Sequence, residues 1–173
     1  MPRTAPSSRT RKAISDWASD ATALAAAVNQ ARQMGYRRIV LAGQSAGAWV
    51  SLAAALRGAP VDGVISIAAA HHGFVEKMTD PTRARSDWQH VVSGLKAGPR
   101  FLIVNFAEDA YDVGGRMDDA RKAFASSGVD AIVIDNPSGF KGHGAAGDFA
   151  FSRKFGACIE KFIESGVRQA PCS

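Results

Sequence analysis

The stretch that most constrains the fold runs from Arg37 to Ala55 and reads RRIVLAGQSAGAWVSLAAA. Its apolar residues Ile39 to Ala42 predict a short buried strand, and the small residues around Trp49 predict a helix. The five residues between them, GQSAG, leave room only for a sharp turn with Ser45 at its centre. We expect a Cβ atom two residues before or after Ser45 to clash in this turn, which explains glycine at both positions. The serine hydroxyl is then held above the C-terminal end of a strand, at the first turn of a helix.

Strands and helices alternate along the rest of the chain. Three more apolar runs, at residues 61–69, 101–106 and 130–134, have the continuous hydrophobicity of strands that are buried on both faces of a sheet. With the first strand they predict an α/β fold, a parallel sheet of about four strands flanked by five helices. Besides the helix around Trp49, the helices are expected between Ser15 and Gly35, Pro81 and Gly98, Gly115 and Gly128, and from Phe151 to Ile163.

The net charge of +5 is mainly a property of the first residues. The first twelve residues hold four Lys and Arg and no acid, and the remainder is close to neutral. We therefore predict a disordered basic tail at 1–13, one domain at 14–166 and a C-terminal tail at 167–173. Because the excess charge is confined to a tail, we expect no nucleic-acid partner. No apolar run approaches the roughly 18–20 residues that span a bilayer, so we expect no membrane partner either.

A strand, a G-x-S-x-G turn and a helix resemble the nucleophile elbow of the α/β-hydrolase superfamily. The chain is most similar to small bacterial esterase and dienelactone-hydrolase-like members, from about Asp16 to about Ser165. The resemblance covers only the C-terminal part of that fold. It implies that Ser45 is the nucleophile and that the backbone N–H of Ala46 is one donor of the oxyanion hole. The glycine-flanked loop around His143 resembles the loop that carries the family's histidine.

Three residues of the required types follow three different predicted strands: Ser45, Asp109 and His143. The C-terminal ends of parallel strands meet at one edge of a sheet, so residues far apart in sequence converge there. The chain order Ser, Asp, His is that of the α/β-hydrolase triad, which assigns them as nucleophile, orienting carboxylate and general base. Asp112 is the alternative acid, and Glu108 is the third choice.

Three more residues are candidates for contact with a substrate. Gln44 directly precedes the expected nucleophile. His71 and His72 follow the strand at 61–69, in a loop that borders the active-site cleft of the family that the chain resembles. The competing interpretation makes both histidines structural.

The two cysteines, Cys158 and Cys172, lie near the C-terminus. Cys158 falls on the apolar face of the last predicted helix, so a buried free thiol is the main interpretation. A disulfide to Cys172, which would imply an oxidising compartment, is the alternative. The sequence has no C-x-x-C pair or metal-ligand cluster, so we expect no metal site. The first residues are not a secretory signal, which favours a cytoplasmic protein, or a periplasmic or secreted one if a longer precursor exists.

The sequence departs from the family before the elbow. About 35 residues precede the first strand, and they predict a tail and one helix where the family has several strands. No HGG-type loop is present to supply a second oxyanion donor. The first strand should also expose one unpaired edge. We expect either a truncated version of a longer hydrolase, or an edge that pairs with a second copy in a homodimer or with another partner.

Together these observations predict a serine hydrolase that cleaves a small-molecule carboxylic ester or thioester through an acyl-enzyme on Ser45. Such chemistry requires no cofactor. An acyltransferase or a peptidase would use the same triad with a different acceptor or substrate. A catalytically inactive remnant or interaction module is the alternative of another class, and the missing oxyanion loop favours it.

Overall fold

A computed structural model describes residues 16–165 and Cys172. The expected tails at 1–13 and 167–173 lie outside these residues, apart from Cys172, as does the expected helix cap Ser15. The described chain forms a four-stranded parallel sheet, five α-helices and two short 3-10 helices. The strands are β1 (Val40–Gln44), β2 (Gly63–Ile67), β3 (Arg100–Asn105) and β4 (Ala131–Asp135). The helices are α1 (Asp16–Gln33), α2 (Ala46–Leu56), η2 (Val75–Lys77), α3 (Pro81–Gly94), α4 (Arg116–Ser127), η3 (Ala145–Gly147) and α5 (Phe149–Ser165).

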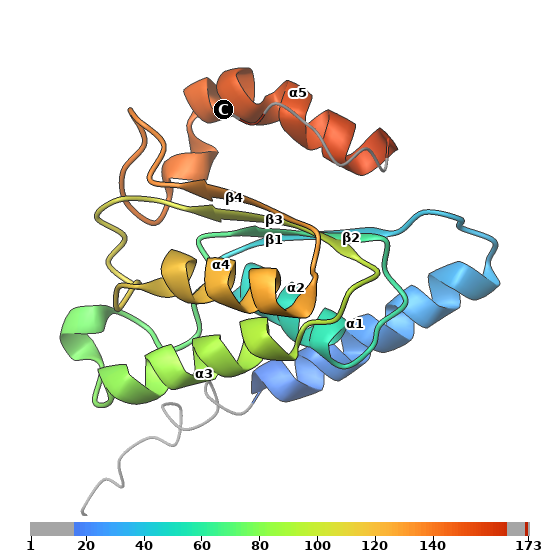
Figure 1. Ribbon diagram of the computed structural model, residues 1–173, viewed down its shortest axis with the longest axis horizontal. Helices are drawn as coiled ribbons and strands as arrows, with labels where there is room; N and C mark the ends of the chain where they lie inside the picture. Colours follow the sequence, from blue (N-terminus) through green and yellow to red (C-terminus); the bar gives the residue numbers. More distant parts are fainter. Residues whose placement is uncertain (1–15, 166–171, 173) are drawn as a thin grey trace, which may run out of the picture.

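The sheet separates two layers of helices. α1 to α4 lie on one face, and α5 covers the other (Figure 1). The strand order is β1-β2-β3-β4, so each strand pairs with its neighbour in sequence through a helical crossover. The pairs are parallel, with Val40 opposite Gly63, Gly63 opposite Arg100, and Phe101 opposite Ala131. The predicted fold class is therefore confirmed.

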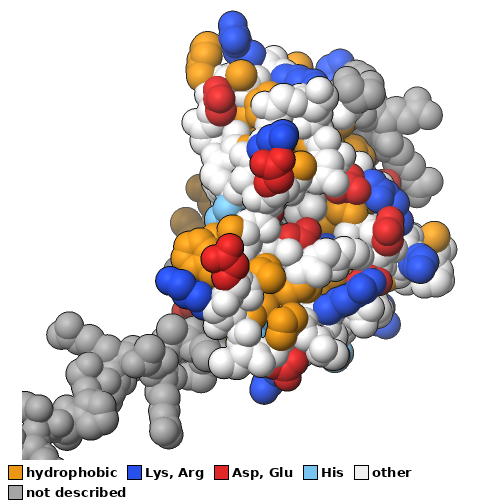
Figure 2. Space-filling model, turned by 90° about the vertical axis from the view of Figure 1, so that its left-hand side faces the viewer, with side chains coloured by type: hydrophobic (Ala, Val, Ile, Leu, Met, Phe, Trp, Pro, Cys, Tyr) orange, Lys and Arg blue, Asp and Glu red, His pale blue; other side chains and the backbone are white. Residues whose placement is uncertain are grey.

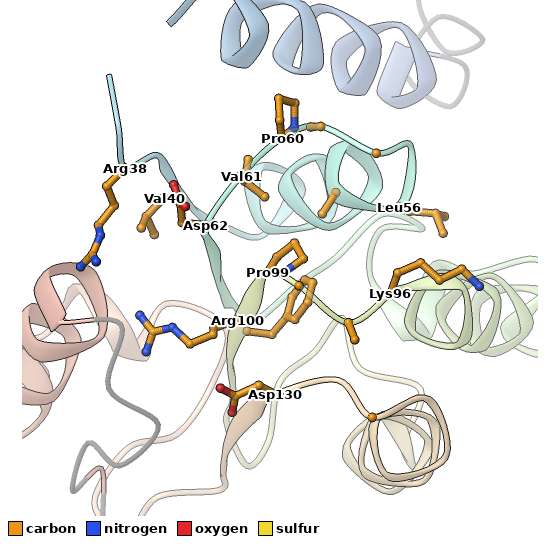
Figure 3. Close-up of a pocket in the computed structure, with 17 residues that line it drawn as sticks. Arg38, Val40, Leu56, Pro60, Val61, Asp62, Lys96, Pro99, Arg100 and Asp130 are labelled. Carbon is orange, nitrogen blue, oxygen red and sulfur yellow. The ribbon is translucent and has the colours of Figure 1, made fainter. Parts of the chain in front are cut away.

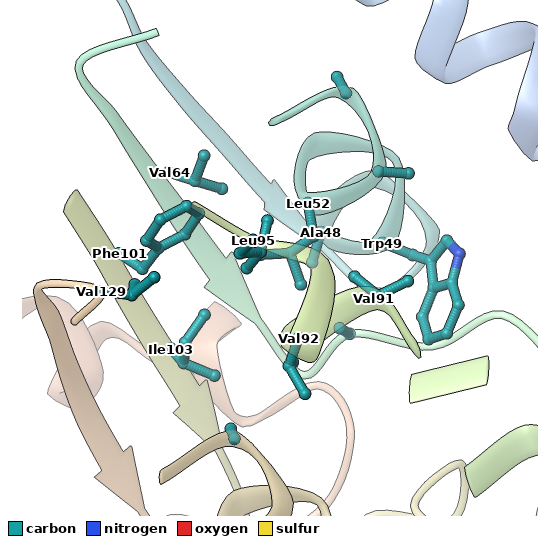
Figure 4. Packing of buried hydrophobic residues seen from close by; sticks show 14 of the residues in the cluster. Ala48, Trp49, Leu52, Val64, Val91, Val92, Leu95, Phe101, Ile103 and Val129 are labelled. Atoms are coloured by element: carbon teal, nitrogen blue, oxygen red, sulfur yellow. The ribbon is translucent and has the colours of Figure 1, made fainter. Parts of the chain in front are cut away.

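The core has two parts because β3 is buried on both faces. Phe101 and Ile103 point to the side of α2, α3 and α4, whereas Leu102 and Val104 point to α5. This alternation explains why residues 101–104 are all apolar. On the first side the contacts include Trp49, Leu52, Val64, Val91, Val92, Leu95 and Val129 (Figure 4). On the second side they include Phe140, Phe151, Phe155 and Phe162.

Local signals fix the ends of several elements. The Asp80 side chain accepts a hydrogen bond from the backbone N–H of Arg83 at 2.8 Å, which caps the first turn of α3 as expected from the Asp-Pro pair. Gly128 ends α4 in the left-handed conformation, with φ 65°. The strand expected at 61–69 is shorter, because Ala68 has a φ of 47° and turns the chain away from the sheet after Ile67.

β1 lies at one edge of the sheet, as the sequence predicted. Ala42 and Gln44 are exposed, whereas most residues of β3 are buried. Within the described chain, the side of β1 away from β2 therefore has no strand beside it. The expectation that a second copy pairs with this edge stays a prediction.

Cys158 and Cys172 form a disulfide, so the interpretation of Cys158 as a free thiol was wrong. The Cα atoms are 5.3 Å apart, a usual distance for a bridged pair. Cys158 is buried on α5, so the bridge fastens Cys172 to that helix.

The described part of the chain contains no helix that is both long and apolar enough to cross a bilayer. It also contains no group of three or more His, Cys, Asp or Glu side chains arranged to hold a metal ion.

Candidate active site

Ser45 connects β1 to α2 in a strained conformation. Its φ is 57° and its ψ is −124°, values that a serine adopts only when the surrounding structure imposes them. Backbone hydrogen bonds impose them here: Ser45 N–H donates to Ile67 at 3.0 Å, and the Ser45 carbonyl accepts from Trp49 and Ala70 at 3.1 and 3.2 Å. The half-buried serine is thereby fixed at the edge formed by the C-terminal ends of the strands.

The two glycines of the turn differ in importance. A Cβ atom on Gly43 would lie 2.3 Å from the Gly47 carbonyl carbon and 2.6 Å from the Ala48 nitrogen. A Cβ atom on Gly47 would have no neighbour within 4 Å. The expectation that both glycines avoid a clash is therefore correct for Gly43 and wrong for Gly47, because the turn brings only Gly43 against the first turn of α2.

Asp109 and His143 meet at the same edge of the sheet. The His143 Nδ1 atom lies 2.9 and 3.0 Å from the two Asp109 carboxylate oxygens. The Asp109 side chain is fully buried, and its Oδ1 also accepts from the backbone N–H of Tyr111 at 2.9 Å. The two loops are joined directly, because the Gly142 N–H donates to the Ala107 carbonyl at 2.7 Å.

This contact defines the chemistry of the imidazole. A carboxylate only accepts hydrogen bonds, so Nδ1 carries the proton and Nε2 keeps its lone pair in the neutral ring. The Nε2 atom of His143 is shielded from solvent and has no hydrogen-bond partner in the described chain. The structure therefore brings Asp109 and His143 together and places Ser45 at the same edge, without a hydrogen bond between Ser45 and His143.

Gln44 links the serine turn to the histidine loop. Its side-chain amide donates to the His143 carbonyl at 2.8 Å, a contact between residues 99 positions apart. The sequence suggested that Gln44 contacts substrate. In the structure its amide instead ties the His143 loop to the end of β1.

The other two candidate acids have different partners. Asp112 accepts from Asn105 at 3.0 Å and from the Gly114 N–H at 2.8 Å, and it lies 3.2 Å from Arg116. Glu108 is exposed and pairs with Lys141 at 2.5 Å. Of the three acids, only Asp109 makes a hydrogen bond with His143 in the described part of the chain.

His71 and His72 lie in an aromatic cluster rather than beside His143. The His71 ring stacks on Trp49, with 5.0 Å between the ring centroids, and contacts Trp17 edge-on. Burial, with a smaller contribution from His72, lowers the pKa of His71 to about 4. The Nε2 atom of His72 lies 2.9 Å from an Asp87 oxygen, without the geometry of a hydrogen bond. These contacts support the structural interpretation of both residues.

Two aromatic residues that the sequence analysis did not single out extend from His143 toward the surface: Tyr111 contacts His143, and Phe74 contacts Tyr111. The Tyr111 ring lies 4.1 Å from the His143 ring, and the Phe74 ring stacks on Tyr111 at 4.3 Å. Phe74 is 46% exposed. Figure 2 looks at the side of the molecule that carries the loops after β3 and β4, where hydrophobic side chains reach the surface between charged ones. Their only sequence signal was their position in loops that follow β2 and β3.

The backbone N–H of Ala46, the expected oxyanion donor, lies at the N-terminal end of α2. Ala46 is the first residue of α2, and its N–H donates to no acceptor in the described chain. The N-terminal end of a helix carries a partial positive charge, which favours a negatively charged oxygen.

A cavity of about 770 Å³ lies at the N-terminal ends of the strands, away from Ser45, Asp109 and His143 (Figure 3). Two arginines on its rim already bind the end of α5: Arg38 donates to the Ile163 carbonyl at 3.1 Å, and Arg100 donates to the Phe162 carbonyl at 2.5 Å. Arg38 and Arg100 thus have a structural role. A smaller cavity of about 390 Å³ borders Asp109 and Asp112.

The sequence matches no family model and no curated protein. Solved structures match in fold. A puromycin-hydrolyzing peptidase of Mycobacterium tuberculosis has a TM-score of 0.66 at 16% identity over 89% of this chain and 27% of that one. Dipeptidyl peptidase 4 of Porphyromonas gingivalis has a TM-score of 0.58 at 19% identity over 78% of this chain and 22% of that one. A truncated carbohydrate esterase from gut microbiota has a TM-score of 0.59 at 14% identity over 87% of this chain and 68% of that one.

These neighbours are hydrolases with an α/β-hydrolase-type fold, and the chain shares the part of that fold that its four strands form. It spans about a quarter of the length of the two peptidases. The finer likeness to dienelactone-hydrolase-like proteins has no support among these matches.

Proposed function

We propose that the chain is a serine hydrolase that cleaves a carboxylic ester or thioester through an acyl-enzyme on Ser45. One observation carries the proposal: a buried Asp109 holds His143 at the sheet edge where a strained turn fixes Ser45. The likeness to hydrolases of the same fold is consistent with it. The finer assignment, to small bacterial esterase or dienelactone-hydrolase-like proteins, rests on the GQSAG turn and the His143 loop.

The reaction follows from the chemistry of these groups. As the Ser45 Oγ atom bonds to the acyl carbon, its proton passes to His143 Nε2, and the Asp109 carboxylate stabilises the imidazolium. The carbonyl oxygen becomes an oxyanion that accepts from the Ala46 N–H. The intermediate then expels the alcohol or thiol, which takes the proton from Nε2. A water molecule repeats both steps and releases the acid.

The contact between Ser45 and His143 forms only during this reaction. Catalytic hydrogen bonds are often absent or long without substrate and close in the reacting complex. The free Nε2 atom of His143 supports this view, because a buried nitrogen without a partner is available to receive the serine proton.

Esters and thioesters fit this site better than amides. The proposed site has one oxyanion donor, the Ala46 N–H at the start of α2, and the loss of one such donor costs about 10²–10³ in rate. Ester and thioester leaving groups depart more readily than amines, so they tolerate a weaker oxyanion hole. Peptide hydrolysis is the second candidate, because two of the structural neighbours are peptidases.

Labelling with a fluorophosphonate probe, read by intact mass and peptide mapping, tests the proposal. We expect one adduct on Ser45, none in Ser45→Ala, and unchanged labelling in Ser93→Ala, whose hydroxyl donates to an α-helical carbonyl on the exposed side of α3. Absence of the adduct from the folded chain would favour the inactive remnant. The rates of hydrolysis of a p-nitrophenyl ester and of the p-nitroanilide of the same acid distinguish an esterase from a peptidase. We expect the ester to be hydrolysed faster.

The role of the acid is tested in the same assay. We expect Asp109→Asn to slow the reaction by about 10⁴, because the imidazole loses the carboxylate that orients it. Glu108→Gln is the matched control: it changes the neighbouring acid, which is exposed and paired only with Lys141. Equal losses in both variants would contradict the assignment of Asp109.

A further inference from the structure

Arg116 is a buried cation that the proposed reaction does not use. It is the first residue of α4 and only 3% exposed. Its Nε atom lies 3.2 Å from Asp112, and its guanidinium faces the Trp88 ring at 5.8 Å. Burial lowers the pKa of Arg116, and the nearby carboxylates of Asp112 and Asp109 oppose this shift. A buried charge of this kind is retained only where its hydrogen bonds are specific.

The hydrogen bonds of Arg116 reach two loops. Its Nη1 donates to the Ala69 carbonyl, in the loop after β2, and its Nη2 donates to the Tyr111 carbonyl at 2.7 Å, in the loop after β3. The Arg116 carbonyl accepts from the Trp88 indole at 2.8 Å, which anchors the start of α4. One side chain therefore bridges two neighbouring strand ends.

Both bridged residues adjoin the candidate catalytic groups. Directly after Ala69, the Ala70 N–H donates to the carbonyl of Ser45 at 3.2 Å. The N–H of Tyr111, whose carbonyl binds Arg116, donates to the Asp109 carboxylate at 2.9 Å. Arg116 thus connects Ser45 and Asp109 indirectly. On one side it binds Ala69, whose neighbour Ala70 binds Ser45, and on the other side it binds Tyr111, which binds Asp109.

We propose that Arg116 is a positioning residue that fixes the loop holding Asp109 relative to the turn holding Ser45. The inference rests on the proposed function, since it assigns Arg116 a part in that reaction. A planar guanidinium binds two carbonyls at once in a fixed direction, which the single ammonium of lysine does not reproduce. Arg116→Lys therefore keeps the charge and weakens the bridge.

The experiment measures the rate of fluorophosphonate labelling of Ser45 from pH 5 to 9 on the full chain, with thermal melting to confirm folding. Arg116→Lys should melt cooperatively and lose about 10-fold or more of the plateau rate, because small misplacements of catalytic groups are costly. The pH profile of labelling should also change shape, because a displaced Asp109 no longer holds the His143 ring through Nδ1. Arg85→Met is the control and should leave the plateau rate and the pH profile unchanged. It removes only the ion pair between Arg85 on α3 and Asp119 on α4.

Two outcomes overturn the proposal while leaving the proposed function intact. One is a plateau rate in Arg116→Lys within about twofold of the unaltered chain. The other is loss of thermal stability with an unchanged plateau and pH profile, which would make Arg116 purely structural. If Arg116→Lys fails to fold, Asp112→Asn decides, because it removes the carboxylate that holds Nε. It should then lower the plateau about threefold or more, and an unchanged plateau overturns the proposal. An unaltered chain that is never labelled overturns both the proposal and the proposed function.

Discussion

At the scale of single residues, the surroundings of a histidine decide its chemistry. His143 faces a buried carboxylate through Nδ1 and has a free Nε2, which is the arrangement that its proposed role as a general base requires. His71 stacks on Trp49 and is held neutral by burial. The sequence placed both histidines after strands, and only the contacts in the structure distinguish the proposed base, His143, from the packing residue, His71.

The lowered pKa of His71 predicts a pH-dependent stability. An exposed imidazole in the unfolded chain binds its proton near pH 6.5, whereas His71 in the folded chain does so at about pH 4. Between these values the unfolded state binds more protons, so stability should fall as the pH decreases from 6.5 to 4 and level off below. Because His71 is only half-buried, we expect a loss of about 1–2 kcal/mol.

Urea unfolding at pH 7, 5.5 and 4 measures this effect. His71→Phe keeps a ring against Trp49 and removes the titrating group, so the difference between the two proteins isolates His71. The same pH dependence in both would show that other groups cause it.

At the scale of elements, the sequence predicted what depends on periodicity. An apolar run followed by a break in the pattern was enough to predict where each strand ends. The sequence therefore predicted that Ser45, Asp109 and His143 lie together at the C-terminal ends of the strands. The geometry of the loops was out of reach. The Gln44 amide on the His143 carbonyl and the Tyr111 ring against His143 depend on how loops from distant parts of the chain meet. No local pattern encodes such contacts.

The turn between β1 and α2 gives a sharp pair of variants. Gly43→Ala should destabilise the protein by about 1–3 kcal/mol, because its Cβ would lie 2.3 Å from backbone that cannot easily move. Gly47→Ala has open space and a helical position, so it should be neutral or slightly stabilising.

Urea unfolding and Ser45 labelling together test this pair. A folded Gly43→Ala should also label more slowly, because the displaced turn moves the serine. Equal stability of the two variants would contradict the asymmetry of the turn.

At the scale of the whole molecule, the sheet has one well-buried centre and one open side. β2 and β3 are covered on both faces, whereas β1, which directly precedes the candidate nucleophile Ser45, has exposed residues. Backbone hydrogen bonds hold the Ser45 turn to Ile67 of β2, to Trp49 of α2 and to Ala70 in the loop after β2. The sheet and the contacts between loops therefore both determine the geometry of the site.

The disulfide lies on the face of the sheet that α5 covers, opposite the face covered by helices α1 to α4. Cys158 and Cys172 are 14 positions apart, and closing a loop of about that length restricts the unfolded chain by roughly 3 kcal/mol at most. We expect reduction, or Cys172→Ser, to lower the free energy of unfolding by about 1–3 kcal/mol. Because Cys158 lies within α5 and none of the contacts described for Ser45, Asp109 or His143 involves it, the labelling rate of Ser45 should stay unchanged under folding conditions. Urea unfolding with and without reductant, beside a thiol count on the denatured chain, measures both effects; two free thiols without reductant would contradict the bridge.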